Sequence, residues 1–133
     1  MGRKKRRVLP QSGDRIADCI FRMIIVALES ISVRKTKEIY DTKNPHEKMI
    51  CGIISSERNK IYLSTKILKK TKEPIVSTLV HEVLHVLMPD VLERFIDQFE
   101  KALYARLTDS QKRYLRMRFI PKYTIKATNS DSA

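Results

Sequence analysis

The chain has 133 residues, of which 27 are lysine or arginine and 15 are aspartate or glutamate, so its formal net charge is +12 at pH 7. This length fits one domain with a modest core, and a hydrophobic content of 42% excludes a strongly disordered chain. This positive charge favours nucleic acid, an acidic partner or an anionic surface as a ligand. An equally good alternative is that the basic surface only keeps the protein soluble.

The amino-terminal segment does not resemble a secretory signal, because no apolar stretch directly follows the basic run at residues 3–7. The most apolar stretch, residues 19–28, contains Arg22 and is too short to cross a bilayer. Cys19 and Cys51 have apolar neighbours and are expected to be buried thiols rather than a disulfide. We therefore expect an intracellular, cytoplasmic protein with no membrane partner.

The first half of the chain predicts a helix followed by a few strands. Residues 1–10 form a basic arm that we expect to be disordered. Apolar residues at helical spacing predict a helix over residues 14–30, with Ser12 or Asp14 as its cap. Strands are expected at residues 31–40, 49–54 and 60–64. A hairpin is predicted by the polar turn at 55–59.

The second half predicts helices. Pro74 is placed to open a helix that runs to Met88, and the next helix is expected over residues 90–107. Thr108 and Gln111 have the spacing of a capping box, which predicts a short basic helix to Arg118. Residues 109–133 are thus expected to be a basic helix and a flexible tail that frays after Pro121. This order of elements predicts an α+β fold.

The segment His81-Glu82-Val83-Leu84-His85 carries the clearest chemistry in the chain. Two histidines four residues apart on a helix lie one above the other, so both can reach a single metal ion. Glu82 is then placed to act on a water molecule beside that ion. The alternative is a pair of surface histidines beside an ordinary helix-forming glutamate. The uncharged residues that flank the motif disfavour this alternative.

A catalytic metal site usually needs a third protein ligand. The remaining histidine, His46, lies in a predicted loop and is expected to be a solvated turn residue. The helix expected after Pro89 carries Glu93, Asp97 and Glu100 on the flank beside its apolar face. If this helix folds back antiparallel, Glu93 is level with His85, and Asp97 is level with His81. Spacing alone leaves both acids open as the third ligand.

The segment from His81 to Asp90, followed by Glu93, resembles the active-site segment of zincin metallopeptidases. More narrowly, it is similar to the minimal gluzincin-like peptidases encoded by phages and prophages. The resemblance covers about residues 14–107, and HExxH is its one sharp motif. It implies a minimal zincin-like domain at residues 11–108, with Zn²⁺ held by His81, His85 and Glu93. It also implies a hydrolase in which Glu82 is the general base that activates water.

The resemblance also implies a peptide or protein substrate. Residues 52–63 resemble the edge-strand region that pairs with substrate in zincins, and we expect residues 60–64 to add a substrate strand. A tyrosine often stabilises the oxyanion in such enzymes. Tyr40, Tyr62 and Tyr104 are candidates, and the sequence does not choose among them.

Two basic regions suggest a second kind of partner. One is residues 3–7, and the other extends from Lys101 to Lys126 with Tyr114 and Phe119 interleaved. The first hypothesis is therefore a zinc peptidase that can be recruited to nucleic acid. The alternative is a nucleic-acid-binding protein on a zincin scaffold without peptidase activity. A regulatory peptidase that acts on one partner cannot be separated from these by sequence, and the oligomeric state is not readable.

Overall fold

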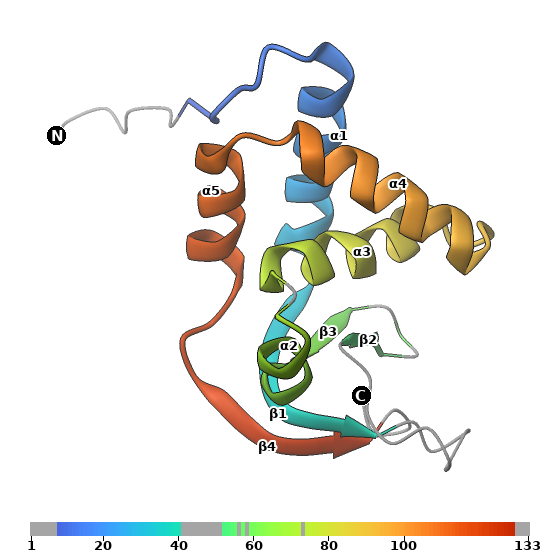
Figure 1. The fold of residues 1–133 in the computed structure, drawn as a ribbon, viewed down its shortest axis with the longest axis vertical. Coiled ribbons are helices and arrows are strands. Elements are labelled where there is room, and N and C mark those ends of the chain that lie inside the picture. The colour runs from blue at the N-terminus through green and yellow to red at the C-terminus, as the bar shows by residue number, and fades with distance from the viewer. Residues whose placement is uncertain (1–7, 41–51, 56, 58, 73, 130–133) are drawn as a thin grey trace, which may run out of the picture.

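The computed structural model describes residues 8–40, 52–55, 57, 59–72 and 74–129, and it confirms an α+β fold (Figure 1). The helices are α1 (Arg15–Glu29), α2 (Thr65–Thr71), α3 (Ile75–Leu87), α4 (Glu93–Arg106) and α5 (Asp109–Phe119). The strands are β1 (Ser32–Tyr40), β2 (Gly52–Ile54), β3 (Lys60–Ser64) and β4 (Thr124–Asn129). Among the described residues, no helix is long and apolar enough to cross a membrane.

The four strands form one mixed sheet in the order β2-β3-β1-β4. β1 is parallel to both β3 and β4, whereas β2 and β3 form the predicted antiparallel hairpin. Its turn is held by Ser55, whose hydroxyl accepts the amide of Lys60 at 3.2 Å and donates to Asn59 at 3.1 Å. β2 therefore lies at one edge of the sheet.

Helix α1 forms where the sequence predicts it. The carboxylate of Asp14 accepts the amides of Ile16 and Ala17 at 3.0 Å each, which satisfies donors that the first helical turn leaves unpaired. The buried apolar side chains of α1 repeat at helical spacing and are Ala17, Phe21, Ile24, Ile25 and Leu28. Cys19 lies on the opposite face and is exposed, so the expectation that it is a buried thiol was wrong. Cys51 lies outside the described residues.

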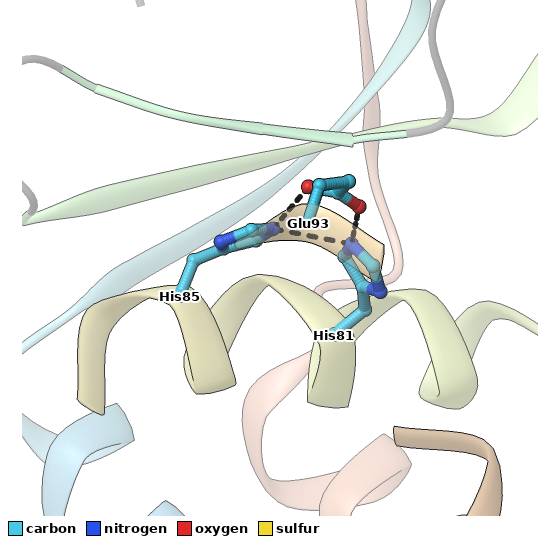
Figure 2. Close-up of side chains that lie close together, drawn as sticks. All are labelled: His81, His85 and Glu93. Carbon is cyan, nitrogen blue, oxygen red and sulfur yellow. Dashed lines mark hydrogen bonds and ion pairs between the residues drawn. The ribbon is translucent and has the colours of Figure 1, made fainter. Parts of the chain in front are cut away.

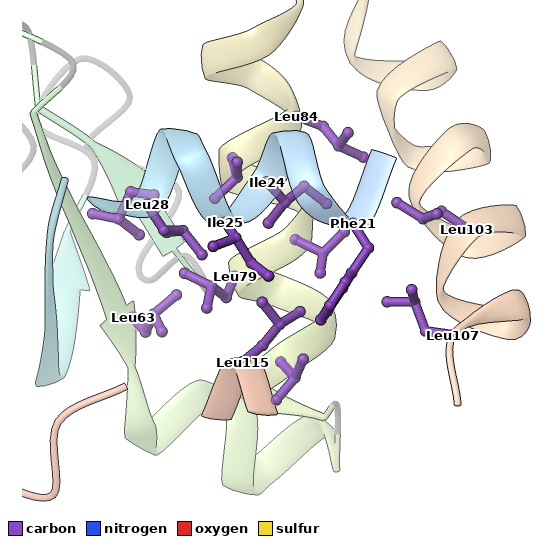
Figure 3. Close-up of a cluster of buried hydrophobic side chains, with 14 of the residues drawn as sticks. Phe21, Ile24, Ile25, Leu28, Leu63, Leu79, Leu84, Leu103, Leu107 and Leu115 are labelled. Atoms are coloured by element: carbon purple, nitrogen blue, oxygen red, sulfur yellow. The ribbon is translucent and has the colours of Figure 1, made fainter. Parts of the chain in front are cut away.

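The core is built around α3, which packs on α1, α4, α5, β2 and β3. Leu79, Val80 and Val83 are completely buried. Figure 3 shows α1 crossing α3, with the side chains of Leu63, Leu103 and Leu115 approaching from the sheet, α4 and α5. A helix enclosed by several elements holds its side chains in fixed positions, so α3 is a rigid base for the HExxH motif.

Two elements were not predicted. Residues 65–71 form α2, capped by the Ser64 hydroxyl, which accepts the amide of Ile67 at 3.3 Å. The sequence does not predict this helix, because Leu68 is its one buried side chain and no apolar repeat marks it. The expectation of a frayed tail after Pro121 was wrong for residues 124–129, because they form β4, which pairs in parallel with β1. Local sequence does not reveal such a strand, since its partner is remote in the chain. Residues 130–133 lie outside the described residues.

Candidate metal centre

The HExxH motif lies near the middle of α3. Pro74 is the residue before the helix, with φ −64° and ψ 129°, and the helix begins at Ile75. The histidines do lie away from the most buried side chains, but they are largely covered. The side chain of His81 is 14% exposed and that of His85 is 24% exposed. Helix α4 provides part of this cover, because its acidic side chains approach both rings.

His81, His85 and Glu93 converge on one point (Figure 2). The Nε2 atoms of the two histidines are 3.2 Å apart. Oε1 of Glu93 is 2.6 Å from Nε2 of His81, and Oε2 is 2.7 Å from Nε2 of His85. The fold-back of α4 after Pro89 brings the glutamate over both rings. Of the two acids that the spacing left open, Glu93 is therefore the one that joins both histidines.

The donor types of this group are ones that bind divalent metal ions such as zinc. Donor atoms at about 2.0–2.1 Å from zinc in a tetrahedron are about 3.3–3.4 Å from one another, close to the separation of the two imidazole nitrogens. The contacts of Glu93 are shorter, as in charge-assisted hydrogen bonds. Two imidazoles and one carboxylate are a ligand set of catalytic zinc sites, which keep one position for water. The structure thus contains a possible metal-binding group of His81, His85 and Glu93.

The other ring nitrogen of His81 faces two further acids. Oδ1 of Asp97 and Oε1 of Glu100 each lie 3.9 Å from Nδ1 of His81. Glu100 is only 6% exposed, and its Oε2 accepts the hydroxyl of Ser77 at 2.9 Å. A carboxylate on this side of a ligating histidine fixes the ring orientation and the tautomer that leaves Nε2 free to bind metal.

Sequence reasoning placed Glu100 on the correct flank of the helix but gave it no role. The signal was the spacing of Glu93, Asp97 and Glu100, which recur at i, i+4 and i+7 and therefore share one helix face. What the spacing does not show is burial. Asp97 has a side chain that is 48% exposed, whereas Glu100 is enclosed between α4 and α3.

Glu82 lies on the wall of a cleft next to the histidines. The cleft has a volume of about 350 Å³ and is lined by Gly52, Ile53, Ile54, Ser55, Glu82, His85 and Pro89. Burial raises the pKa of Glu82 to about 7, while His81 acts to lower it and Glu93 to raise it further. A carboxyl group with a pKa near neutrality can both accept and donate a proton at physiological pH.

Strand β2 approaches Glu82 closely because it begins with a glycine. A Cβ atom on Gly52 would lie 3.0 Å from Cγ2 of Thr78 and 3.2 Å from both Cγ and Oε2 of Glu82. These distances are shorter than ordinary van der Waals contact. A glycine at this position therefore lets the strand form one wall of the cleft.

The strand expected to receive a substrate was wrongly identified. β3, at residues 60–64, pairs with β1 on one side and with β2 on the other, so it has no free edge. The edge strand beside the cleft is β2, three residues long, and it belongs to the broader region 52–63 that resembled a zincin edge strand.

The tyrosine candidates for oxyanion stabilisation remain unassigned. Tyr62 is 8% exposed and packs in β3. Tyr104 is half-buried on α4, where burial, together with Glu100 and Asp109, raises its pKa, and the Lys112 ammonium lies 4.2 Å from the centre of its ring. The side chain of Tyr40 and the whole of His46 lie outside the described residues.

Comparison with protein-family models finds no match, and comparisons with curated proteins and with solved structures find no significant match either. The candidate site is therefore supported by its geometry alone. Two imidazoles and a carboxylate converge on one point, and a buried glutamate lies in the adjoining cleft.

Proposed function

We propose that this chain is a minimal zincin-like metallopeptidase that hydrolyses peptide bonds. The observation that carries the proposal is the convergence of His81, His85 and Glu93 next to a cleft that contains Glu82. These four residues supply three ligands and a proton acceptor, which is the minimum for metal-assisted hydrolysis. The group could hold other divalent ions, but imidazole and carboxylate ligands in a tetrahedral arrangement suit zinc.

Each side chain has a distinct part in the reaction. Bound zinc would polarise the scissile carbonyl and lower the pKa of the attacking water. His81 and His85 would act as ligands through Nε2, and the buried carboxylate of Glu100 would orient His81 from the other side of its ring. Glu82, which lies in the cleft beside the histidines, would take a proton from the attacking water and donate it to the leaving nitrogen.

The substrate of this proposal is an extended peptide that pairs with β2. Gly52, Ile53 and Ile54 all line the cleft, and β2 ends the sheet among the described strands. Backbone pairing with an edge strand recognises the main chain, so the expected cleavage is broad in sequence.

The test begins with the metal. Purified, untagged protein is loaded with zinc, freed of excess, and analysed for metal. About one zinc per chain is expected for the wild type, and a large loss is expected for His81→Ala. An absence of bound zinc in the loaded wild type would overturn the proposal.

The second step separates metal binding from hydrolysis. Glu82→Gln should keep its zinc but lose cleavage of casein, because the amide cannot accept a proton. Glu29→Gln makes the same chemical change at an exposed position at the end of α1 and should cleave like the wild type. A zinc-loaded wild type that cleaves neither casein nor unstructured peptides would instead support a zincin scaffold without peptidase activity.

A further inference from the structure

A basic surface lies on α5 and on the segment that follows it. Residues 109–122 contain five basic side chains and one acidic side chain. Four of the basic ones are exposed, and we call them the α5 basic surface: Arg113, Arg116, Arg118 and Lys122. Figure 1 shows α5 at one side of the molecule, with the sheet below it and α4 beyond α1. The surface thus lies on a different part of the fold from the candidate metal centre.

The cations of this surface lack acidic partners among the residues that the structure describes. In the part of the chain that the structure describes, no carboxylate lies within ion-pair distance of these four side chains. Elsewhere the basic residues do find partners: Lys101 pairs with Asp97 at 3.2 Å, and Arg106 pairs with Asp14 at 3.4 Å. Unpaired like charges on one helix repel one another, and an external polyanion would relieve that repulsion.

The surface contains a hollow in which anionic groups could be held. It has a volume of about 520 Å³ and is lined by Pro10, Ser110, Arg113, Tyr114, Met117 and Arg118. Two guanidinium groups and two hydroxyl groups are therefore available among its lining residues. Guanidinium groups bind phosphate oxygens with two parallel hydrogen bonds, so these residue types suit a phosphate.

The amino-terminal segment is fixed beside the same hollow. The side-chain amide of Gln111 donates to the carbonyl of Pro10 at 3.2 Å, and Gln111 itself is fully buried. The basic run at residues 3–7 joins the described chain at Val8, two residues before Pro10. The start of the described chain is therefore attached to α5 at Pro10, which itself lines the hollow.

The apolar residues of α5 disfavour a membrane surface as the partner. Leu115 is completely buried, and Phe119 and Ile120 are half-buried against the core. Met117 is the one large apolar side chain that the described part of α5 exposes. A helix that binds a membrane interface needs a continuous apolar face to insert, and the apolar side of α5 is already used by the fold.

We propose that the α5 basic surface binds nucleic acid through its phosphate backbone. A polymer with regularly spaced phosphates matches several unpaired cations on one surface. Such binding weakens steeply with salt, because each phosphate contact releases bound counterions. The inference does not depend on peptidase activity or on bound metal.

The test uses the full chain and a fluorescein-labelled 20-base-pair DNA duplex, with binding followed by fluorescence anisotropy between 50 and 200 mM NaCl. The surface variant replaces Arg113, Arg116 and Arg118 with glutamine. The control variant replaces Arg15, Arg22 and Lys69 with glutamine, which removes the same charge from exposed positions on α1 and α2. Circular dichroism and thermal melting check that both variants are folded.

The surface variant should bind at least about tenfold more weakly than the wild type, and the control should stay within about threefold. The slope of log affinity against log salt should become less steep by about 2–3 in the surface variant, since each lost contact contributes about 0.9. Equal weakening in both variants, or no measurable binding by the wild type at 50 mM NaCl, would overturn the proposal. Vesicles with 30% phosphatidylserine are the counter-test, and binding to them but not to DNA would assign the surface to a membrane.

Discussion

The side-chain amide of Gln111 lies 2.8 Å from Oδ1 of Asp18, so two residues 93 positions apart in the sequence connect the start of α5 to the start of α1. Asp18 also accepts the amide and the hydroxyl of Ser12, at 2.9 and 2.7 Å. The Oε1 atom of Gln111 accepts the amide of Thr108 at 2.9 Å, which completes the predicted capping box. One buried glutamine thus caps its own helix and anchors a second one.

The carboxylate of Asp18 should make stability depend on pH in the acid range. Hydrogen bonds from the backbone and the hydroxyl of Ser12, with a further one from Gln111, lower the pKa of Asp18 from 3.8 to about 2. A group whose pKa is lower in the folded state stabilises the fold above its unfolded pKa, and it loses that contribution as the pH falls to its folded pKa. Asp18→Asn should therefore be less stable than the wild type at pH 7, with a difference that shrinks between about pH 5 and pH 2.

Urea unfolding at a series of pH values measures this difference. Asp90→Asn, at an exposed position between α3 and α4, is the matched control and should follow the wild-type profile. If the gap between Asp18→Asn and the wild type were the same at pH 2 as at pH 7, the ionised carboxylate would not be the stabilising group.

Glu93→Gln and Asp97→Asn should differ sharply in zinc affinity. Glu93 contacts both imidazoles, whereas Asp97 approaches only the far nitrogen of His81 at 3.9 Å. Loss of a direct ligand should weaken zinc binding roughly 100-fold or more, and loss of Asp97 should change it by less than about threefold. Competition with a chromogenic chelator measures both constants. A larger effect from Asp97→Asn would assign the third ligand to Asp97.

Glu100→Gln tests whether the buried carboxylate positions His81. We expect about tenfold weaker zinc binding, because the ring of His81 loses a charged neighbour at Nδ1. Ser77→Ala should have a smaller effect in the same direction, since it removes only the hydroxyl that donates to Glu100. A role limited to stability would lower the melting temperature of the metal-free protein without changing its zinc affinity.

Gly52→Ala should disturb the cleft without touching the metal ligands. The added methyl group would press on Thr78 and Glu82 at 3.0 and 3.2 Å, so one of them or the strand must shift. We expect a loss of about 1–3 kcal/mol in the free energy of unfolding. If the chain is a peptidase, kcat/KM should fall at least about tenfold with zinc content unchanged.

The double variant Gly52→Ala/Thr78→Ser is the control for crowding, because it removes the Cγ2 atom closest to the new methyl group. It should recover part of the lost stability. If the single variant were as stable and as active as the wild type, close approach of β2 to Glu82 would not matter for the site.

The sequence determined the elements whose signals are local. Apolar spacing and an N-terminal Asp14 predict α1, the Thr108–Gln111 pair predicts the start of α5, and the turn at residues 55–59 predicts the hairpin. The two histidines of the candidate site also follow from local geometry, because residues four apart on any helix share a face. The α+β class follows from the order of these elements.

The tertiary structure decided everything that depends on which remote segments meet. It joined Glu93 rather than Asp97 to both histidines, and it enclosed Glu100 beside His81. It placed β2, rather than residues 60–64, at an edge of the sheet. It also paired residues 124–129 of the expected tail with β1 as β4. The helical repeat predicts which way a side chain points, but it does not predict which other helix or strand packs over that side chain. Burial and strand pairing are properties of pairs of segments, so one segment read alone does not contain them.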